Sequence, residues 1–316
     1  MNMVISMRSN KKKKKSIIKK VVIVFSILIF FIVSVFLYSR YLATSLFTIH
    51  EYEIENELFQ ENFHGFKIVH MSDLHYLTTL NEEQLSQIVD KINELKPDAV
   101  VLTGDLLDQH IEYSNQELKE LETLLSHIEV TTNKYAISGD EDETKTEWET
   151  VIKNSGFINL NNTYDLIYHG VGSPIMVSGM SSNLKEQDMI TTKIKPIEDQ
   201  IDATLPVADQ NGNRTYGITN PIYQILLIHE PDTIEEFNYH KFQLILAGHS
   251  LNGQIRLPGI GGILNTKGAK TYKNSFYDLD GTLLYISGGI GTKEQIPYRL
   301  FNRPSINLYR LIGEIE

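Results

Sequence analysis

An uncharged stretch of 18 residues, Val21 to Tyr38, constrains the fold of this chain more than any other feature. Only Ser26 and Ser34 interrupt its run of apolar side chains. Apolar residues just before it extend the run toward the ~20 residues that a helix needs to cross a bilayer. The length and composition of this segment therefore predict a transmembrane helix.

The residues before this stretch predict its orientation. The first 40 residues hold nine basic residues and no acidic one, and most of the basic ones directly precede the apolar run. Because basic loops stay on the cytoplasmic side of a membrane, we expect the N-terminus in the cytoplasm. We predict a basic cytoplasmic tail at residues 1–16, a transmembrane helix at 17–39, a connector at 40–47 and an extracytoplasmic domain at 48–316.

Two alternatives stay open for the apolar stretch. A cleaved signal peptide has a shorter apolar region, about 7–15 residues, followed by a cleavage site of small residues. Residues 39–45 offer only a poor site of this kind. A buried helix of a soluble core is the second alternative. An uncleaved anchor agrees best with the length and the basic flank, so the lipid bilayer is the first expected partner.

The charge of the predicted domain excludes a class of partners. Taking the nine basic residues of the first 40 from the chain's 29 leaves 20 basic against 40 acidic residues. Such a domain repels nucleic acid over most of its surface, so we expect no nucleic-acid partner. The chain also contains no cysteine, which excludes disulfides, a thiol nucleophile and zinc bound by cysteine.

Beyond the connector, short apolar runs alternate with helical stretches. Residues 66–71 have the composition of a buried strand, and residues 82–95 repeat apolar side chains on one helical face. This alternation predicts an α/β layered domain. Residues 185–220 are polar and lack a clear period, and we predict a loop or insertion there. Further strands are expected at 48–55, 98–102, 134–138, 175–178, 224–228, 243–246, 283–287 and 306–311, and further helices at 116–128 and 145–154.

Acidic residues and histidines follow five of the predicted strands, where an α/β sheet presents its ligand-binding edge. Each motif alone is weak, because a single aspartate after a strand is usually a helix cap. Converging carboxylates and imidazoles would repel one another or stay unpaired unless cations held them. Mixed Asp and His ligation suits Mn, Fe or Zn better than Ca or Mg. The motifs are Asp73-Leu-His75, Gly104-Asp105-Leu-Leu-Asp108, Gly139-Asp140-Glu141-Asp142, His229 and Gly248-His249-Ser-Leu251.

In this order the motifs resemble those of the calcineurin-like metallophosphoesterases, which read D-x-H, G-D-x-x-D, G-N-H-[DE], a lone H and G-H-x-H. The resemblance covers residues 48–316, and the ending Gly289-Ile-Gly-Thr292 with Pro297 to Pro304 is similar to the membrane-anchored bacterial branch. It implies a four-layer sandwich of two mixed sheets flanked by helices, after an N-terminal transmembrane helix.

The resemblance also implies a ligand set. One divalent transition metal (Mn, Fe or Zn) would be held by Asp73, His75 and Asp105. A second would be held by Asp105, which bridges the two, together with Asp140, His229 and His249. Two such ions clamp a phosphate and activate a hydroxide for in-line attack.

Three positions depart from the family's pattern. Asp140 replaces an Asn ligand, and its carboxylate can still bind a cation. Glu141 replaces the His that steadies the leaving group, and an ionised Glu there repels phosphate. Leu251 replaces the last His of the first metal's ligand set and cannot bind metal. Three outcomes stay open: one ion bound firmly and a second weakly, a single ion, or rescue by a neighbour such as Asn252.

We therefore count Glu141, Asp108 and Asp142 as candidate catalytic positions, the last two through hydrogen bonds to the ligands. The leading hypothesis is a hydrolase of envelope phosphomonoesters or phosphodiesters that acts through metal-activated hydroxide, outside the cytoplasmic membrane. The alternative is a catalytically impaired metal-binding protein that recognises an envelope phosphate compound or a partner protein. A purely structural anchor without metal is the third hypothesis.

Overall fold

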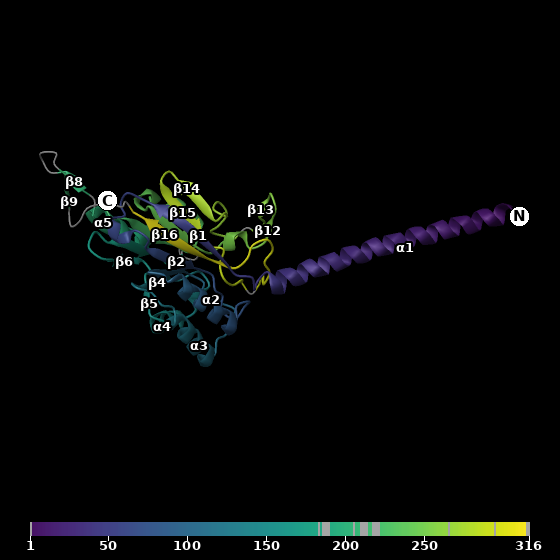
Figure 1. Cartoon of the computed structure of the whole chain (residues 1–316), viewed down its shortest axis with the longest axis horizontal. Helices are drawn as coiled ribbons and strands as arrows, with labels where there is room; N and C mark the ends of the chain where they lie inside the picture. Colours follow the sequence, from purple (N-terminus) through teal and green to yellow (C-terminus); the bar gives the residue numbers. More distant parts are fainter. Residues whose placement is uncertain are drawn as a thin grey trace. The chain divides into compact units, whose positions relative to one another are not determined.

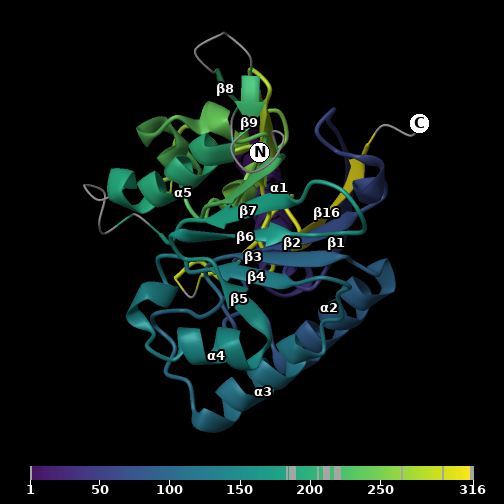
Figure 2. The same ribbon diagram turned by 90° about the vertical axis from the view of Figure 1, so that its left-hand side faces the viewer.

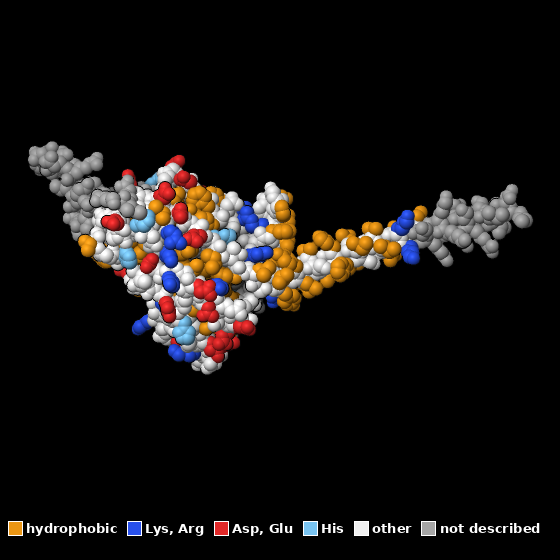
Figure 3. Space-filling view, viewed as in Figure 1, with side chains coloured by type: hydrophobic (Ala, Val, Ile, Leu, Met, Phe, Trp, Pro, Cys, Tyr) orange, Lys and Arg blue, Asp and Glu red, His pale blue; other side chains and the backbone are white. Residues whose placement is uncertain are grey.

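The structure is a computed structural model that describes residues 2–182, 184, 190–204, 206–208, 214–216, 222–264, 266–293 and 295–313. The chain divides into two compact units, Met1–Leu42 and Ala43–Glu316. In the first unit, α1 spans Asn2–Leu37 and a π-helical turn continues it over Tyr38–Leu42. The part from Ile17 to Leu42 is long and apolar enough to cross a membrane. Its apolar side chains are exposed along the helix (Figure 3).

The second unit builds two six-stranded sheets (Figure 1). The first has the order β1-β16-β2-β3-β4-β5, and all its pairs are parallel except β16 with β2. The parallel run β2-β3-β4 brings the carboxyl ends of these strands to one edge of the sheet. The bounds are β1 Thr48–Glu55, β2 Lys67–Met71, β3 Ala99–Thr103, β4 Lys134–Ile137, β5 Phe157–Asn159 and β16 Ser305–Ile312.

The second sheet has the order β14-β15-β11-β10-β7-β6, with a parallel centre and an antiparallel strand at each edge. Both sheets are therefore mixed. The bounds are β6 Thr163–Ile167, β7 Ile175–Gly179, β10 Gln224–Leu227, β11 Leu244–Ala247, β14 Phe276–Leu279 and β15 Thr282–Ile286. Two small hairpins pair β8 Pro206–Ala208 with β9 Arg214–Tyr216, and β12 Arg256–Leu257 with β13 Gly261–Gly262.

Alternating side chains on the strands explain why the two sheets stack. Val100 and Leu102 of β3 pack with the helices, whereas Val101 belongs to the core between the sheets. Figure 2 shows α2, α3 and α4 on one side of β3, β4 and β5, and α5 beyond β6 and β7 on the opposite side. The domain thus has four layers, helices, sheet, sheet and helix, which confirms the predicted fold class. The helices are α2 Glu82–Leu95, α3 Asn115–Ser126, α4 Trp148–Asn154 and α5 Ile190–Thr204.

Local sequence explains where the covering helices begin. Asn81 and Gln84 form a capping box at the start of α2, and Ser114 and Glu117 form another at the start of α3. Each box satisfies backbone N–H groups that have no partner inside the helix. Short 3₁₀ helices connect the remaining elements, at Glu61–Phe63, Asp142–Thr144, Pro231–Glu236, Tyr239–Lys241 and Leu251–Gly253.

Residues 190–204 form α5, so the loop alternative of the prediction for residues 185–220 is wrong there, whereas the insertion alternative stays a prediction. Ile190, Ile194, Ile197 and Ile201 are buried against the second sheet and follow a helical spacing. Their burial holds the helix together although Pro196 removes one of its backbone hydrogen bonds. Other parts of the predicted loop, residues 185–189, 205, 209–213 and 217–220, lie outside the described residues.

Candidate metal centre

The candidate ligands lie where the carboxyl ends of both sheets' parallel strands meet. Asp73 and His75 follow β2, Asp105 follows β3 and Asp140 follows β4, all in the first sheet. His229 and His249 follow β10 and β11, which are adjacent parallel strands of the second sheet. The structure thus brings all six predicted ligands together, in two clusters that share Asp105. These are Asp105, Asp140, His229 and His249, and Asp73, His75 and Asp105.

The backbone around the ligands is held in conformations that are unfavourable for most residues. Asp73, His75, Asp105 and His249 have positive φ angles of 51°, 41°, 52° and 64°. Non-glycine residues pay roughly 1–3 kcal/mol for such angles, and they persist where surrounding contacts impose them. Here the amide N–H of Asp73 donates to the carbonyl of Gly104 at 3.0 Å, and that of His75 to the carbonyl of Asp105 at 3.0 Å. The loops after β2 and β3 therefore fix each other.

In the four-residue cluster, ligand atoms face one another at close range. Nε2 of His229 lies 3.2 Å from Oδ2 of Asp105 and 3.3 Å from Oδ1 of Asp140. Nδ1 of His249 lies 3.1 Å from the same Asp140 oxygen. Three of the four side chains are at most 1% exposed, and that of Asp140 is 15% exposed. The cluster is therefore nearly closed to water.

The outer ring nitrogens of both histidines are committed to backbone carbonyls. Nδ1 of His229 lies 2.6 Å from the carbonyl oxygen of Thr103, and Nε2 of His249 lies 2.6 Å from that of Lys267. Because a carbonyl only accepts, these two nitrogens carry the hydrogens, and the other nitrogen of each neutral ring turns a lone pair toward Asp105 and Asp140. Lone pairs that face carboxylates are stabilised when a cation lies between them, and a proton on His229 or a metal ion can fill this role.

The same conclusion follows from the electrostatics of His229. Burial lowers the pKa of this imidazole, but the carboxylates of Asp105 and Asp140 outweigh burial and raise it well above its usual value. A site that pulls a proton onto a fully buried ring is one that attracts positive charge. Converging carboxylate oxygens and imidazole nitrogens fit a divalent transition metal, so the residues present fit the expected cofactor.

The three-residue cluster is equally buried. Nε2 of His75 lies 3.6 Å from Oδ2 of Asp105, and its Nδ1 lies 3.5 Å from Oδ2 of Asp108, with all three side chains 0% exposed. Asp105 Oδ2 thus faces His229 in one cluster and His75 in the other. Its second oxygen, Oδ1, accepts a hydrogen bond from the amide of Glu141 at 3.0 Å. Asp105 therefore contributes a carboxylate to both clusters and would be the ligand common to two cations.

The position of Leu251 explains why the cluster of Asp73, His75 and Asp105 has fewer donors than the four-residue cluster. Its side chain is 2% exposed, and a Cβ placed on Gly289 would lie 2.2 Å from Leu251 Cδ2 and 3.1 Å from Asp73 Cβ. Leu251 therefore fills the space beside Asp73 with an apolar group. Asn252, the alternative donor, has its Oδ1 engaged by Arg256 at 2.8 Å. Within the described residues, neither position adds a ligand atom to Asp73, His75 and Asp105.

The three candidate catalytic positions have different surroundings. Asp142 accepts hydrogen bonds from the amides of Leu107 and Gly139 at 2.9 Å each, so its carboxylate ties two ligand loops together. Burial and the neighbouring Asp105 raise the pKa of Asp142 to about 7, against the effect of these amide donors. Asp108 faces His75, with Oδ2 at 3.5 Å from Nδ1 of the ring. Glu141 is buried, and its Oε1 lies 3.4 Å from Nζ of Lys293.

Lys293 is the residue that sequence reasoning missed. Its Nζ lies 3.7 Å from Asp105 Oδ2, 3.7 Å from Asp140 Oδ1 and 3.4 Å from Glu141 Oε1. Burial opposes the charged form, but these carboxylates outweigh burial and raise the pKa of Lys293. One feature of the sequence could have pointed to Lys293: it directly follows Gly289–Thr292, a segment similar to the membrane-anchored bacterial branch of the family.

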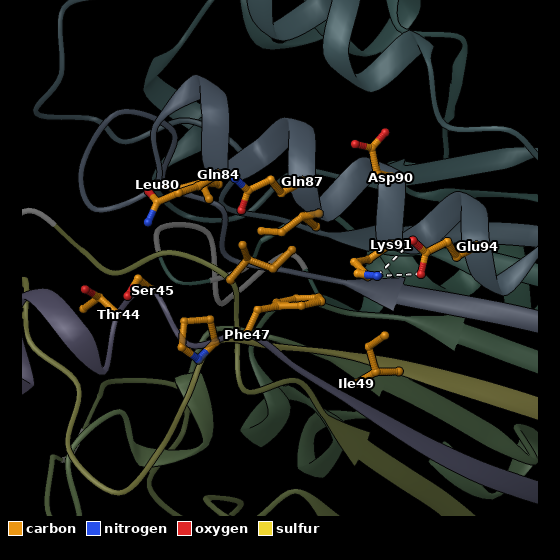
Figure 4. Close-up of a pocket in the computed structure, with 13 residues that line it drawn as sticks. Thr44, Ser45, Phe47, Ile49, Leu80, Gln84, Gln87, Asp90, Lys91 and Glu94 are labelled. Atoms are coloured by element: carbon orange, nitrogen blue, oxygen red, sulfur yellow. Dashed lines mark hydrogen bonds and ion pairs between the residues drawn. The ribbon is translucent and has the colours of Figure 1, made fainter.

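A separate cavity of about 600 Å³ lies between β1 and α2. Figure 4 shows Phe47 and Ile49 on one side and Gln84, Gln87 and Lys91 on the other. The residues that line it include none of the six candidate ligands. It is therefore distinct from the metal centre.

Four layers and two ligand clusters that share an aspartate define a domain built to hold metal at the edge of two sheets. Residues 66–253 match the family of calcineurin-like phosphoesterases, and this segment contains all six candidate ligands. Since the match covers more than half of the chain, the protein belongs to this family, whose members are hydrolases of phosphate esters.

Two relatives known by sequence agree with this assignment. An uncharacterized metallophosphoesterase, YkuE of Bacillus subtilis (strain 168), is 28% identical over 277 residues, covering 87% of this chain and 88% of the relative. UDP-2,3-diacylglucosamine pyrophosphatase LpxG of Chlamydia muridarum is 25% identical over 300 residues, covering 80% of this chain and 85% of LpxG. Among solved structures, TT1561 of Thermus thermophilus is similar with a TM-score of 0.38 and 11% identity, covering 71% of this chain and 90% of that chain.

Proposed function

We propose that this protein is a membrane-anchored phosphoesterase that hydrolyses a phosphomonoester or phosphodiester of the cell envelope. The observation that carries the proposal is the sharing of buried Asp105 between two ligand clusters, with His229 on one side and His75 on the other. Metal ions bound in such a pair of sites polarise a phosphate ester and lower the pKa of water between them. The protein's own residues then hold and orient the reacting groups.

Groups around the ligands hold the ligand side chains in place. The carbonyls of Thr103 and Lys267 fix the rings of His229 and His249 so that a lone pair of each faces the centre. At His75, Oδ2 of Asp108 lies 3.5 Å from Nδ1, an electrostatic contact rather than a hydrogen bond. Such supporting contacts raise the affinity of a ligand for metal and keep its orientation. The ligand geometry is thus set before any substrate arrives.

Glu141 predicts which esters react fastest. A departing oxygen must be neutralised by a proton or by positive charge, and an ionised carboxylate at this position supplies neither. Esters with acidic leaving groups need less help, because their oxygen leaves as a stable anion. We therefore propose that activated diesters are turned over faster than unactivated ones.

The membrane anchor and a relative support the choice of an envelope substrate. The segment Ile17–Leu42 can cross a membrane, and the basic residues before it favour a cytoplasmic N-terminus with the domain outside. The relative LpxG is a pyrophosphatase of a lipid-bearing sugar nucleotide by its name. A phosphate compound at the membrane surface is accordingly the proposed class of substrate.

The test uses the full chain in detergent, stripped of metal and reloaded with Mn²⁺ or Zn²⁺. Hydrolysis of bis-para-nitrophenyl phosphate should require the metal and should be lost in Asp105→Asn. The matched control is Asp199→Asn, which removes a carboxylate that is 60% exposed and paired with Lys195. This control should keep wild-type activity. No metal-dependent hydrolysis of mono- or diesters would contradict the proposal and favour a metal-binding protein that recognises phosphate compounds without cleaving them.

A further inference from the structure

The carboxylates in and beside the two clusters carry more negative charge than two divalent ions can offset. Five carboxylates lie in or beside the two clusters: those of Asp73, Asp105, Asp140 and Glu141 around the centre, and that of Asp108 at 3.5 Å from His75. With neutral histidines they carry a formal charge of about −5, of which two divalent ions offset about four units. A centre that keeps negative charge attracts an anionic phosphate ester weakly. A further positive charge is needed to make the loaded centre attractive to its substrate.

Lys293 supplies that charge at the required place. Its ammonium lies 3.4–3.7 Å from Asp105, Asp140 and Glu141, so it faces both the shared carboxylate and that of Glu141. Its side chain is 19% exposed, which leaves it accessible to a bound anion. The two carboxylates that depart from the family's pattern, Asp140 and Glu141, are both among its neighbours. Lys293 thus offsets part of the negative charge that these two positions add.

The loop that carries Lys293 is fixed to the metal centre rather than free to swing. The amide of Gly291 donates to the carbonyl of Asp73 at 2.7 Å, and the Thr78 hydroxyl donates to the carbonyl of Thr292 at 2.7 Å. The buried guanidinium of Arg299 donates to the carbonyl of Gly291 at 2.5 Å. A Cβ on Gly291 would lie 1.9 Å from the carbonyl oxygen of Leu74, so the loop packs directly on the Asp73–His75 segment. The backbone next to Lys293 is therefore held in a fixed position relative to the Asp73–His75 segment.

We propose that Lys293 is a substrate-binding residue of this centre, whose ammonium contacts a phosphoryl oxygen of the bound ester and offsets the negative charge that two divalent ions leave at the site. This inference rests on the proposed function, because the anion is taken to be the phosphoryl group of the substrate. The rival role is that of a counter-ion that only balances buried carboxylates when metal is absent. The two roles differ in what happens to anion binding when both sites are filled.

The experiment measures binding of inorganic phosphate to the full chain in detergent at saturating Mn²⁺, by calorimetry, with the bound Mn²⁺ counted in parallel. Lys293→Met should weaken phosphate binding roughly 10- to 100-fold, the typical effect of losing a hydrogen bond to a charged group. Lys293→Arg keeps the charge and should stay within about threefold of wild type. Lys91→Met is the matched control, since it removes the charge of a lysine that is 52% exposed and paired with Glu94.

Three results would overturn the inference: no phosphate binding by the wild type, equal phosphate affinity in wild type and Lys293→Met, or less bound Mn²⁺ in Lys293→Met. Removing the Lys293 ammonium from three carboxylates should strengthen the binding of other cations, Mn²⁺ included. Less bound Mn²⁺ in Lys293→Met would therefore mean that the substitution damages the metal sites themselves. These measurements need no turnover. If the wild type cleaves no ester but binds phosphate through Lys293, the proposed function fails while the inference stands.

Discussion

Gly139 is the position at which one added methyl group should disturb the metal centre most. A Cβ on this residue would lie 2.2 Å from Oδ1 of Asp105, 2.5 Å from the Asp105 amide nitrogen and 2.8 Å from Cε1 of His229. Ordinary van der Waals contacts begin at 3.4 Å, so the shared carboxylate would have to move by more than 1 Å. The φ angle of Gly139 is not positive, and alanine is therefore excluded by contact with ligands rather than by backbone strain.

The expected magnitude of Gly139→Ala follows from these contacts. Overpacking a buried site costs about 1–3 kcal/mol. Displacing Oδ1 of Asp105 also breaks its hydrogen bond from the amide of Glu141, and bonds to charged groups contribute roughly 1.5–3 kcal/mol. Together the free energy of unfolding should fall by about 3–6 kcal/mol. Affinity for Mn²⁺ should fall at least about 100-fold, because residues that only support a ligand already cost roughly 10- to 100-fold when mutated.

Both quantities can be measured on one sample. Urea unfolding can be followed through Trp148, the single tryptophan, which is buried in α4. Calorimetric titration gives the Mn²⁺ affinity. The control is Gly281→Ala, where φ is +96° and a Cβ meets no atom within 4 Å. It should cost about 1–2 kcal/mol of backbone strain and leave Mn²⁺ binding unchanged. Wild-type Mn²⁺ affinity in Gly139→Ala would refute the reasoning.

Three further predictions concern the cluster of Asp73, His75 and Asp105, acid stability and topology. Leu251→His adds a ligand to this cluster and should increase the Mn²⁺ that survives dialysis against a moderate chelator. Two ions retained by the wild type would contradict weak binding at this cluster. Burial lowers the pKa of His70 to about 3. The unfolded chain therefore binds a proton that the folded chain excludes, and stability should fall by about 1.4 kcal/mol per pH unit below about pH 6.5 and above about pH 3. In His70→Gln this part of the pH slope should vanish, and equal slopes in the two proteins, measured by urea unfolding, would count against it. Protease added to intact protoplasts should digest residues 50–316, and complete protection of this region would contradict an extracytoplasmic domain.

Regular periodicity made much of the fold predictable from the sequence. Residues 82–95 form α2 with the predicted bounds, because their apolar side chains recur on one face and a capping box fixes the start. The carboxyl ends of buried strands were predicted to carry the ligands, and the structure brings Asp73, Asp105 and His249 to one place. Both inferences depend on local pattern and on general rules of sheet geometry.

What the sequence could not predict depends on tertiary contacts. The isoleucines of α5 follow a helical spacing, but Pro196 and polar neighbours suggested a loop, and only the second sheet that they cover makes the helix favourable. Lys293 lies far along the chain from Asp105 and Asp140, and no spacing rule links them. Its position results from a loop that packs on the Asp73–His75 segment, which becomes visible only in the folded domain.

The place of β16 in the first sheet has a consequence for how the protein folds. β16 follows every other described strand in the sequence, yet it lies between β1 and β2 and pairs with both. Until residues 305–312 have been synthesised, β1 has no neighbour in this sheet and β2 has an open edge. Pairings between such distant segments form slowly, and open strand edges invite association with other chains. A nascent chain that stops short of β16 should therefore expose the edge of β2 and the unpaired β1 to other chains.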